Sequence, residues 1–221
     1  MATLPADVPQ AAQHAGEDEV FVFPVSSAQR RLWFLHRLQP DGTLYNVQRS
    51  SRLSGPVLPG VLCRAVQAMV DRHELLRTTF APGEDGEPVQ LIARRQRAPF
   101  TAVDLRRLDP ARRDAEAARL VAAEGDRPFD LAAGPLARFV LATLADGDHV
   151  LVTTLHHVIT DEQSMYVLAR ELNQAYESFG RGEEPDFPEL PVQYADYAEW
   201  EREMLAGSAA AGHLEYWRRR L

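Results

Sequence analysis

The residue types best suited to chemistry are concentrated in one short segment, residues 156–164, which reads His-His-Val-Ile-Thr-Asp-Glu-Gln-Ser. An extended, apolar run precedes it, and neighbouring side chains in a β-strand point to opposite faces. His156 and His157 should therefore diverge, one entering the core or a helix layer and the other facing a cleft. A neutral imidazole accepts a proton near neutral pH, so the histidine in the cleft is a candidate general base.

A carboxylate follows the two histidines, at the expected N-terminus of the next helix. Negative charge is favoured there, so Asp161 suits this position, and Thr160 and Gln163 have the spacing of a capping box. If it is buried, Asp161 also needs a cationic partner, for which Arg77 is the candidate. A metal site has weaker support because no third ligand is evident from the spacing. A serine hydrolase is disfavoured because the sequence has no Gly-x-Ser-x-Gly elbow.

The composition excludes several classes of protein. The 221 residues carry a net charge of −8, from 32 acidic and 24 basic residues. All of the basic residues are arginine. An acidic chain without a basic block is poorly suited to binding nucleic acid. The single cysteine, Cys63, excludes an internal disulfide or a cysteine-rich zinc site. We see no signal peptide and no apolar run of the ~20 residues that a membrane helix needs, so we expect a cytoplasmic protein.

The elements that would position the histidines alternate between strands and helices. Residues 1–20 lack periodicity and are interpreted as a mobile leader, and residues 21–221 as one domain. A hairpin around residues 145–148 is the clearest feature, and its second strand leads into the histidines. The mixture predicts an α+β fold in which helices pack on a mixed β-sheet. We expect strands over 45–53, 78–80, 89–93, 136–144 and 149–159, and helices beginning near 27 and over 59–77, 110–126, up to 180, 194–205 and 213–221.

Several blocks of the sequence, taken in order, resemble the core motifs of nonribosomal peptide synthetase condensation domains. The segment at 156–162 is similar to the His-His-x-x-x-Asp-Gly motif of that family. Co-occurrence in the family's order is more specific than any one block, and the resemblance covers nearly everything after the leader. The other blocks are residues 27–35 with 45–46, 72–80, 128–136, 194–200 and 216–217.

The resemblance implies a chloramphenicol-acetyltransferase-like fold of two lobes around a tunnel. Only the motifs of the N-terminal lobe occur here, so we interpret the chain as that lobe without the second, and expect it to be inactive in isolation. In the family, two carrier-protein phosphopantetheine arms meet in the tunnel and an amide bond forms. The expected partners are therefore aminoacyl and peptidyl carrier proteins and the second lobe, with no membrane, nucleic acid, metal or directly bound cofactor.

The same resemblance assigns roles to individual residues. His157 corresponds to the catalytic histidine, acting as proton acceptor or as the group that positions the amine. His156 would be structural, as would Asp161, paired with Arg77.

One position departs from the family motif. Glu162 replaces the motif's glycine and adds a carboxylate beside the proposed base. It is either a tolerated acid at a helix N-terminus or a second catalytic acid/base group. In the second case the product would change, because removal of an α-proton from a seryl thioester and loss of its hydroxyl group yields dehydroalanine. That chemistry is associated with the modified-amino-acid subtype of the family.

Two further alternatives remain open from the sequence. One is a free-standing acyltransferase of the same fold that uses coenzyme A, although the first and fourth family blocks favour the synthetase. The other is a non-catalytic, condensation-like module that docks an accessory enzyme, which the intact His157 disfavours.

Overall fold

The computed structural model describes residues 19–221, apart from the side chains of residues 208 and 209. The expected leader over residues 1–20 therefore lies almost entirely outside the described residues. Its last residue, Val20, belongs instead to the first strand, β1 (Val20–Pro24). None of the described helices is long and apolar enough to cross a membrane.

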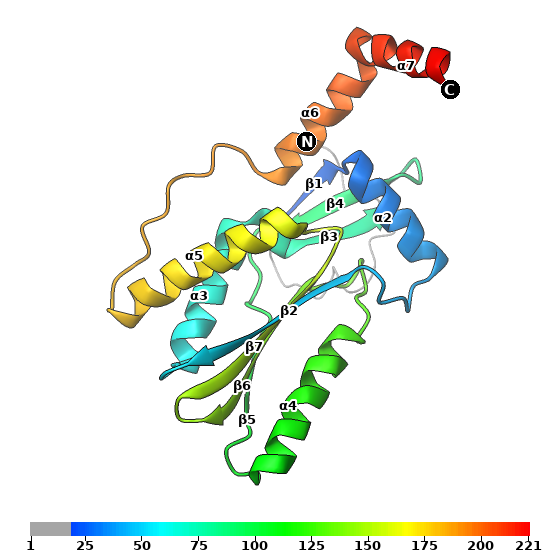
Figure 1. Cartoon of the computed structure of the whole chain (residues 1–221). Coiled ribbons are helices and arrows are strands. Elements are labelled where there is room, and N and C mark those ends of the chain that lie inside the picture. The colour runs from blue at the N-terminus through cyan, green and yellow to red at the C-terminus, as the bar shows by residue number, and fades with distance from the viewer. Residues whose placement is uncertain (1–18) are drawn as a thin grey trace.

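The strands form two sheets (Figure 1). The larger has the order β2 (Asn46–Ser54), β7 (Asp148–His156), β6 (Ala137–Ala145) and β5 (Phe100–Asp104). It is mixed, because β5 runs parallel to β6 while the other pairs are antiparallel. The predicted hairpin is β6–β7. The smaller sheet places β4 (Pro88–Ala93) between β1 and β3 (Thr78–Pro82).

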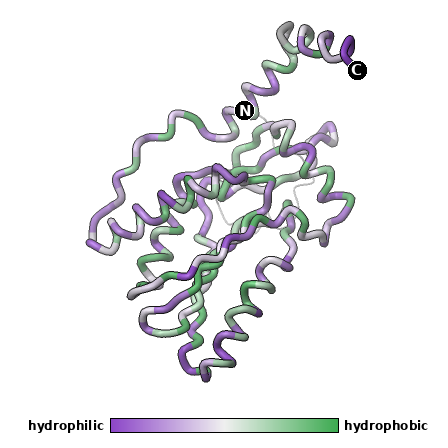
Figure 2. Tube along the Cα trace, viewed as in Figure 1, coloured by the Kyte–Doolittle hydropathy of each residue, from purple (hydrophilic) through white to green (hydrophobic). Residues whose placement is uncertain are grey.

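Helices cover both faces of the larger sheet (Figure 1). Helices α3 (Pro59–Arg72) and α5 (Glu162–Gly180) pack against each other on one face, and α4 (Pro110–Gly125) packs on the other. Strand β6 contributes to both sides, since Phe139 and Leu141 join the core with α3 and α5 whereas Ala142 and Leu144 join Ala117 of α4. This two-sided burial explains the nearly continuous hydrophobic colouring of the central strands (Figure 2). The predicted α+β layering is confirmed.

Several elements differ from the sequence-based expectation. Strand β1 was not predicted, the strand expected to reach residue 159 ends at His156, and the last helix begins at Ser208 rather than at 213. The helix expected over 59–77 ends at Arg72, because His73 has an extended backbone (φ −104°, ψ 108°) and a 3₁₀ turn, η1 (Glu74–Arg77), follows. Strand β5 was not predicted. It is a five-residue strand at the edge of the sheet with three exposed positions, so it carries little of the apolar alternation that marks a strand.

The remaining helices lie toward one end of the sheets. Helix α2 (Ser27–Leu38) begins at a capping box formed by Ser26 and Gln29. A segment without helix or strand runs from residue 181 to 193, as its Pro/Glu composition predicts, and leads to α6 (Tyr194–Ala206) and α7 (Ser208–Arg220). Figure 1 shows α6 and α7 extending away from the sheets.

Candidate functional site

The end of strand β7 fixes where the two histidines lie. The β2–β7 register runs unbroken to the pair Asn46–His156. Beyond this pair, the His157 N–H donates to the Tyr45 carbonyl over 2.8 Å, and the Ile159 N–H closes a turn on the His156 carbonyl over 3.0 Å. Because the register holds up to the turn, the two side chains diverge as predicted, with His156 buried and His157 exposed.

His156 is a core residue, with only 2% of its surface exposed. Its ring lies 6.0–6.3 Å from the rings of His36, Tyr45 and Phe129. Its Nδ1 accepts a hydrogen bond from the Val158 N–H over 3.1 Å, so the ring is held in the turn that follows it. Burial, more than the neighbouring His36 and His157, lowers the pKa of His156 to about 4. A neutral ring in this position suits the structural role that the sequence suggested.

His157 is oriented by a single short contact. Its Nδ1 lies 2.7 Å from the carbonyl oxygen of Thr160. A carbonyl oxygen can only accept a hydrogen bond, so Nδ1 carries the proton, and in the neutral ring Nε2 is the nitrogen with a lone pair. The turn after β7 therefore selects the tautomer in which Nε2 can accept a proton.

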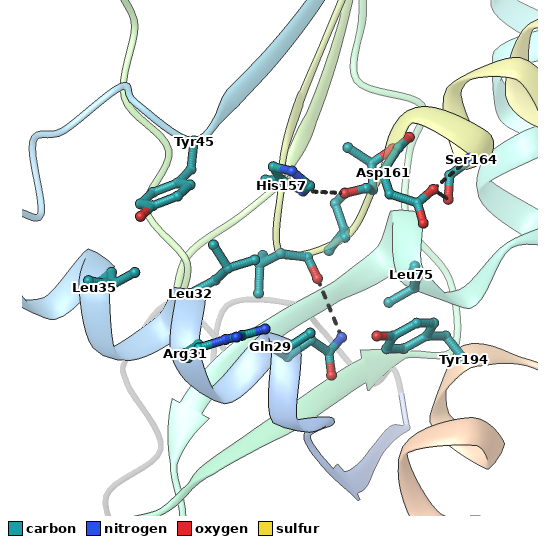
Figure 3. A pocket seen from close by; sticks show the side chains of 14 residues that line it. Gln29, Arg31, Leu32, Leu35, Tyr45, Leu75, His157, Asp161, Ser164 and Tyr194 are labelled. Atoms are coloured by element: carbon teal, nitrogen blue, oxygen red, sulfur yellow. Dashed lines mark hydrogen bonds between the residues drawn. The ribbon is translucent and has the colours of Figure 1, made fainter. Parts of the chain in front are cut away.

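A cavity of about 410 Å³ adjoins His157 (Figure 3). Helix α2 forms one wall, the turn at 157–161 and Ser164 of α5 form another, and Tyr45, Leu75 and Tyr194 complete it. The wall formed by α2 contributes Ala28, Gln29, Arg31, Leu32 and Leu35. The cavity thus combines a predominantly apolar lining with one imidazole, as expected of a site that binds organic substrates.

Gln29 connects α2 to the histidine turn and was not identified from the sequence as a site residue. It is buried, and its side-chain amide donates to Gln90 Oε1 over 3.1 Å and to the Val158 carbonyl over 3.4 Å. Gln90 in turn donates to the Pro24 carbonyl over 2.7 Å. Its signal in the sequence is a glutamine three residues before Leu32 and four before Trp33, on the apolar face of the helix.

The expected ion pair between Asp161 and Arg77 is not formed. Asp161 is exposed and is the N-cap of α5, where its Oδ1 accepts from the Ser164 N–H at 2.7 Å and from the Ser164 hydroxyl at 2.6 Å. Arg77 donates instead to the Ala93 carbonyl at 2.6 Å and to Glu74 at 3.4 Å. Asp161 needs no buried cation because it remains at the surface. The cap expected from Thr160 is also wrong by one residue.

A buried ion cluster near this site was not predicted from the sequence. Glu171 of α5 is buried, and its Oε2 lies 3.1 Å from Arg72 Nε and 2.7 Å from His73 Nε2. The cluster fastens α5 to the end of α3. Its signal in the sequence is an acid on the apolar face of a helix, three residues after Leu168 and four before Ala175.

Glu162 occupies the first turn of α5, as expected, and is exposed. It does not belong to the lining of the cavity beside His157, which includes Asp161 and Ser164 on either side of it in sequence. Within residues 19–221, no group of three or more His, Cys, Asp or Glu side chains is placed to hold a metal ion.

Comparison with known proteins identifies the family. The family model described as "Condensation domain" matches residues 21–221. The chain belongs to the condensation domain family. This confirms the resemblance seen in its motifs, and the match begins where the expected leader ends.

Individual relatives agree with this assignment. A linear gramicidin synthase of Brevibacillus parabrevis is 44% identical over 198 residues, which are 90% of this chain and 4% of the relative. The phosphinothricin tripeptide synthetase PhsC of Streptomyces viridochromogenes is 43% identical, over 90% of this chain and 18% of its own length. The chain therefore spans a small part of these curated relatives.

Solved structures share the fold. The starter condensation domain of rhizomide synthetase superposes with a TM-score of 0.81 at 22% identity, over 90% of this chain and 48% of the solved chain. The X-domain solved in complex with OxyB from teicoplanin biosynthesis superposes with a TM-score of 0.78 at 29% identity, over 99% of this chain and 44% of the solved chain. The chain thus corresponds to about half of each solved chain.

The position of Asp161 predicts a modest effect of its removal. Loss of an N-cap costs about 0.5–2 kcal/mol, whereas breaking a buried ion pair costs about 3–5 kcal/mol. We expect Asp161→Ala to lower the free energy of unfolding by the smaller amount in urea denaturation at pH 7, and Asp161→Asn, which can still cap, to lower it less. A loss of about 3 kcal/mol or more in the alanine variant would show that Asp161 is not simply a cap.

The buried His156 predicts a pH dependence of stability. Because its folded-state pKa, about 4, lies below the ordinary 6.5, the unfolded chain takes up the proton first as the pH falls. The stability that His156 contributes is therefore complete above pH 6.5 and declines between about pH 6.5 and 4. In urea denaturation over this range, the difference between wild type and His156→Asn should shrink as the pH falls. A difference that does not change with pH would contradict the buried neutral ring.

Proposed function

We propose that this chain is the N-terminal lobe of a nonribosomal peptide synthetase condensation domain that forms amide bonds between carrier-bound thioesters. The observation that carries the proposal is the exposed His157 beside a cavity of about 410 Å³, with Nδ1 held by the Thr160 carbonyl. The relatives that match most of the chain are named as peptide synthetases, which supports this reaction over the alternatives.

The proposed reaction uses the lone pair on Nε2 of His157. The neutral amine of the acceptor aminoacyl group attacks the donor thioester carbonyl, and Nε2 hydrogen-bonds to the amine or accepts its proton. The carbon–sulfur bond then breaks, the amide bond forms, and the thiolate of the donor arm recovers a proton. The contact with Thr160 keeps the ring ready for this role, and holding both arms in one cavity contributes through proximity.

The partners are part of the proposal. The two acyl groups are carried on phosphopantetheine arms of carrier proteins, and a second lobe completes the tunnel around His157. The exposed apolar side chains of Phe34 and Leu38 belong to α2, the helix that forms one wall of the cavity beside His157, and support a further surface packed against this helix. A cytoplasmic location fits the thioester substrates, which are made inside cells.

The first test removes the imidazole. His157→Ala, introduced into the two-lobed domain with loaded donor and acceptor carrier proteins, should lower amide formation by roughly 10²–10⁴-fold, because general acid–base groups typically contribute that much. Intact-mass analysis of the acceptor carrier measures the product. His213→Ala, an exposed histidine of α7, is the matched control and should retain full activity.

The same assay separates the alternatives. Amide formation from carrier-bound but not coenzyme A thioesters supports the synthetase, and the reverse preference would identify an acyltransferase that uses coenzyme A. Wild-type turnover that survives His157→Ala would overturn the proposed role of this residue.

The role of Glu162 stays a prediction with its own test. Its exposed position outside the lining of the cavity favours a tolerated helix-end acid. In that case Glu162→Gln and Glu162→Gly should each form the same amide product at the wild-type rate, within about a factor of two. A drop of ~10²-fold or more for Glu162→Gln in a folded domain would instead assign it acid/base chemistry. Dehydration would be identified if the wild type converts a seryl donor to a product lighter by one water and Glu162→Gln no longer does so.

A further inference from the structure

A second cavity, of about 290 Å³, adjoins the one beside His157. The two share a boundary formed by Leu75, Ile159, the 160–161 turn, Ser164 and Tyr194. Leu75 and Tyr194 lie next to each other at the edge of the histidine cavity in Figure 3. A group bound beside His157 therefore has a neighbouring space into which it can extend.

The second cavity has an apolar interior. Leu76 of η1, Leu155 of β7 and Leu168 of α5 line it and are themselves buried, so the walls are part of the core. Val167, Leu190 and Val192 complete the apolar lining from α5 and from the segment before α6. Apolar walls of this kind favour an apolar ligand through the surface that it removes from water.

Two polar residues at the inner end of the cavity, His73 and Gln193, are hydrogen-bonded to groups behind its wall. His73 contacts Glu171 at 2.7 Å, and Gln193 donates to the Arg72 carbonyl at 3.0 Å and accepts from the Glu74 N–H at 3.3 Å. None of the lining residues is among those with a buried, unpartnered side-chain N or O atom in the described part of the chain. The polar lining residues Asp161, Gln163 and Ser164 lie where α5 begins, so the interior walled by Leu76, Leu155 and Leu168 offers a polar ligand few partners.

The contacts of Arg72 hold the walls of the cavity in place. Arg72 donates to Glu171 on α5 and, over 2.8 Å, to the Pro188 carbonyl in the segment before α6. This arginine therefore ties together the end of α3, the wall of α5 and the covering segment. A cavity of about 150 Å³ lined by Leu, Ile and Phe admits benzene, so about 290 Å³ admits a branched or aromatic side chain.

We propose that this second cavity binds an apolar side chain of one of the aminoacyl groups that react at His157, and so selects for that side chain. The proposal rests on the proposed condensation function. The shared boundary at Leu75 and Tyr194 lets the backbone of the aminoacyl group remain beside His157 while its side chain enters the second cavity.

The test changes the size of the cavity and measures side-chain preference. In the two-lobed domain with loaded carriers, kcat/KM is measured for leucyl, alanyl and lysyl groups, each presented first in the donor and then in the acceptor position. We expect the wild type to prefer leucyl about tenfold or more in one position, since a hydrophobic pocket gains about 10–200-fold per methylene. Val167→Phe, which fills the cavity, should lower the leucyl-to-alanyl ratio about tenfold in that position alone, with alanyl turnover retained.

The controls make each outcome decisive. Val22→Phe makes the same change at an exposed residue of β1 and should leave the ratio unaltered. If circular dichroism shows that Val167→Phe does not fold, the leucyl-to-alanyl ratio is measured instead for Val192→Phe, at the exposed rim of the cavity. An unchanged ratio in both positions, or a wild-type preference for lysyl over leucyl groups, would overturn the apolar pocket while the condensation function stands. Absence of amide formation from every pairing in the wild type would instead refute the proposed function, and this inference with it.

Discussion

The hydrogen bond from His157 Nδ1 to the Thr160 carbonyl, 2.7 Å long, determines what the exposed imidazole can do. It assigns the ring proton to Nδ1 and leaves the lone pair on Nε2, and it depends on a turn that several other contacts hold in place. The β2–β7 register positions the turn along the sheet, and the ring of His156, buried and neutral, anchors it from beneath. Gln29 approaches it from α2, and Asp161 converts the turn into the start of α5. Loss of any of these contacts would therefore change the orientation of the His157 ring.

The charged residues of the family block at 72–80 have different contacts because their side chains meet different surroundings. Arg72 and His73 converge on the buried Glu171, whereas Arg77, at the end of η1, donates to the Ala93 carbonyl at the end of β4. An ion pair inside the protein persists only when its hydrogen bonds are satisfied, and the Glu171 cluster meets that condition. Asp161 stays at the surface, so its charge is stabilised by Ser164 and the helix N-terminus. The frame around the second cavity is therefore held by the cluster, and the histidine turn by a cap.

Much of this arrangement is predictable from the sequence, and the exceptions have physical causes. The period of two in β7 is sufficient to separate His156 from His157, because side-chain direction in a strand is a local property. The helix stripes and the hairpin are local in the same way. The ion pair assigned to Asp161 and Arg77 was wrong because pairing depends on which residues are buried together, and that is decided by packing. The contacts of Gln29 and Glu171 were missed for the same reason, since their partners are distant in sequence. Strand β5 was missed because an exposed edge strand carries little apolar alternation.

The central claim is that His157 presents Nε2 as a proton acceptor, and imidazole tautomers are directly measurable. The chain labelled with ¹⁵N-histidine, recorded at about pH 8 where an ordinary imidazole is neutral, gives separate Nδ1 and Nε2 signals for each ring. His157→Ala identifies the signals of interest. The account predicts a protonated Nδ1 and an unprotonated, pyridine-like Nε2 for His157. A predominantly Nε2–H tautomer would contradict it.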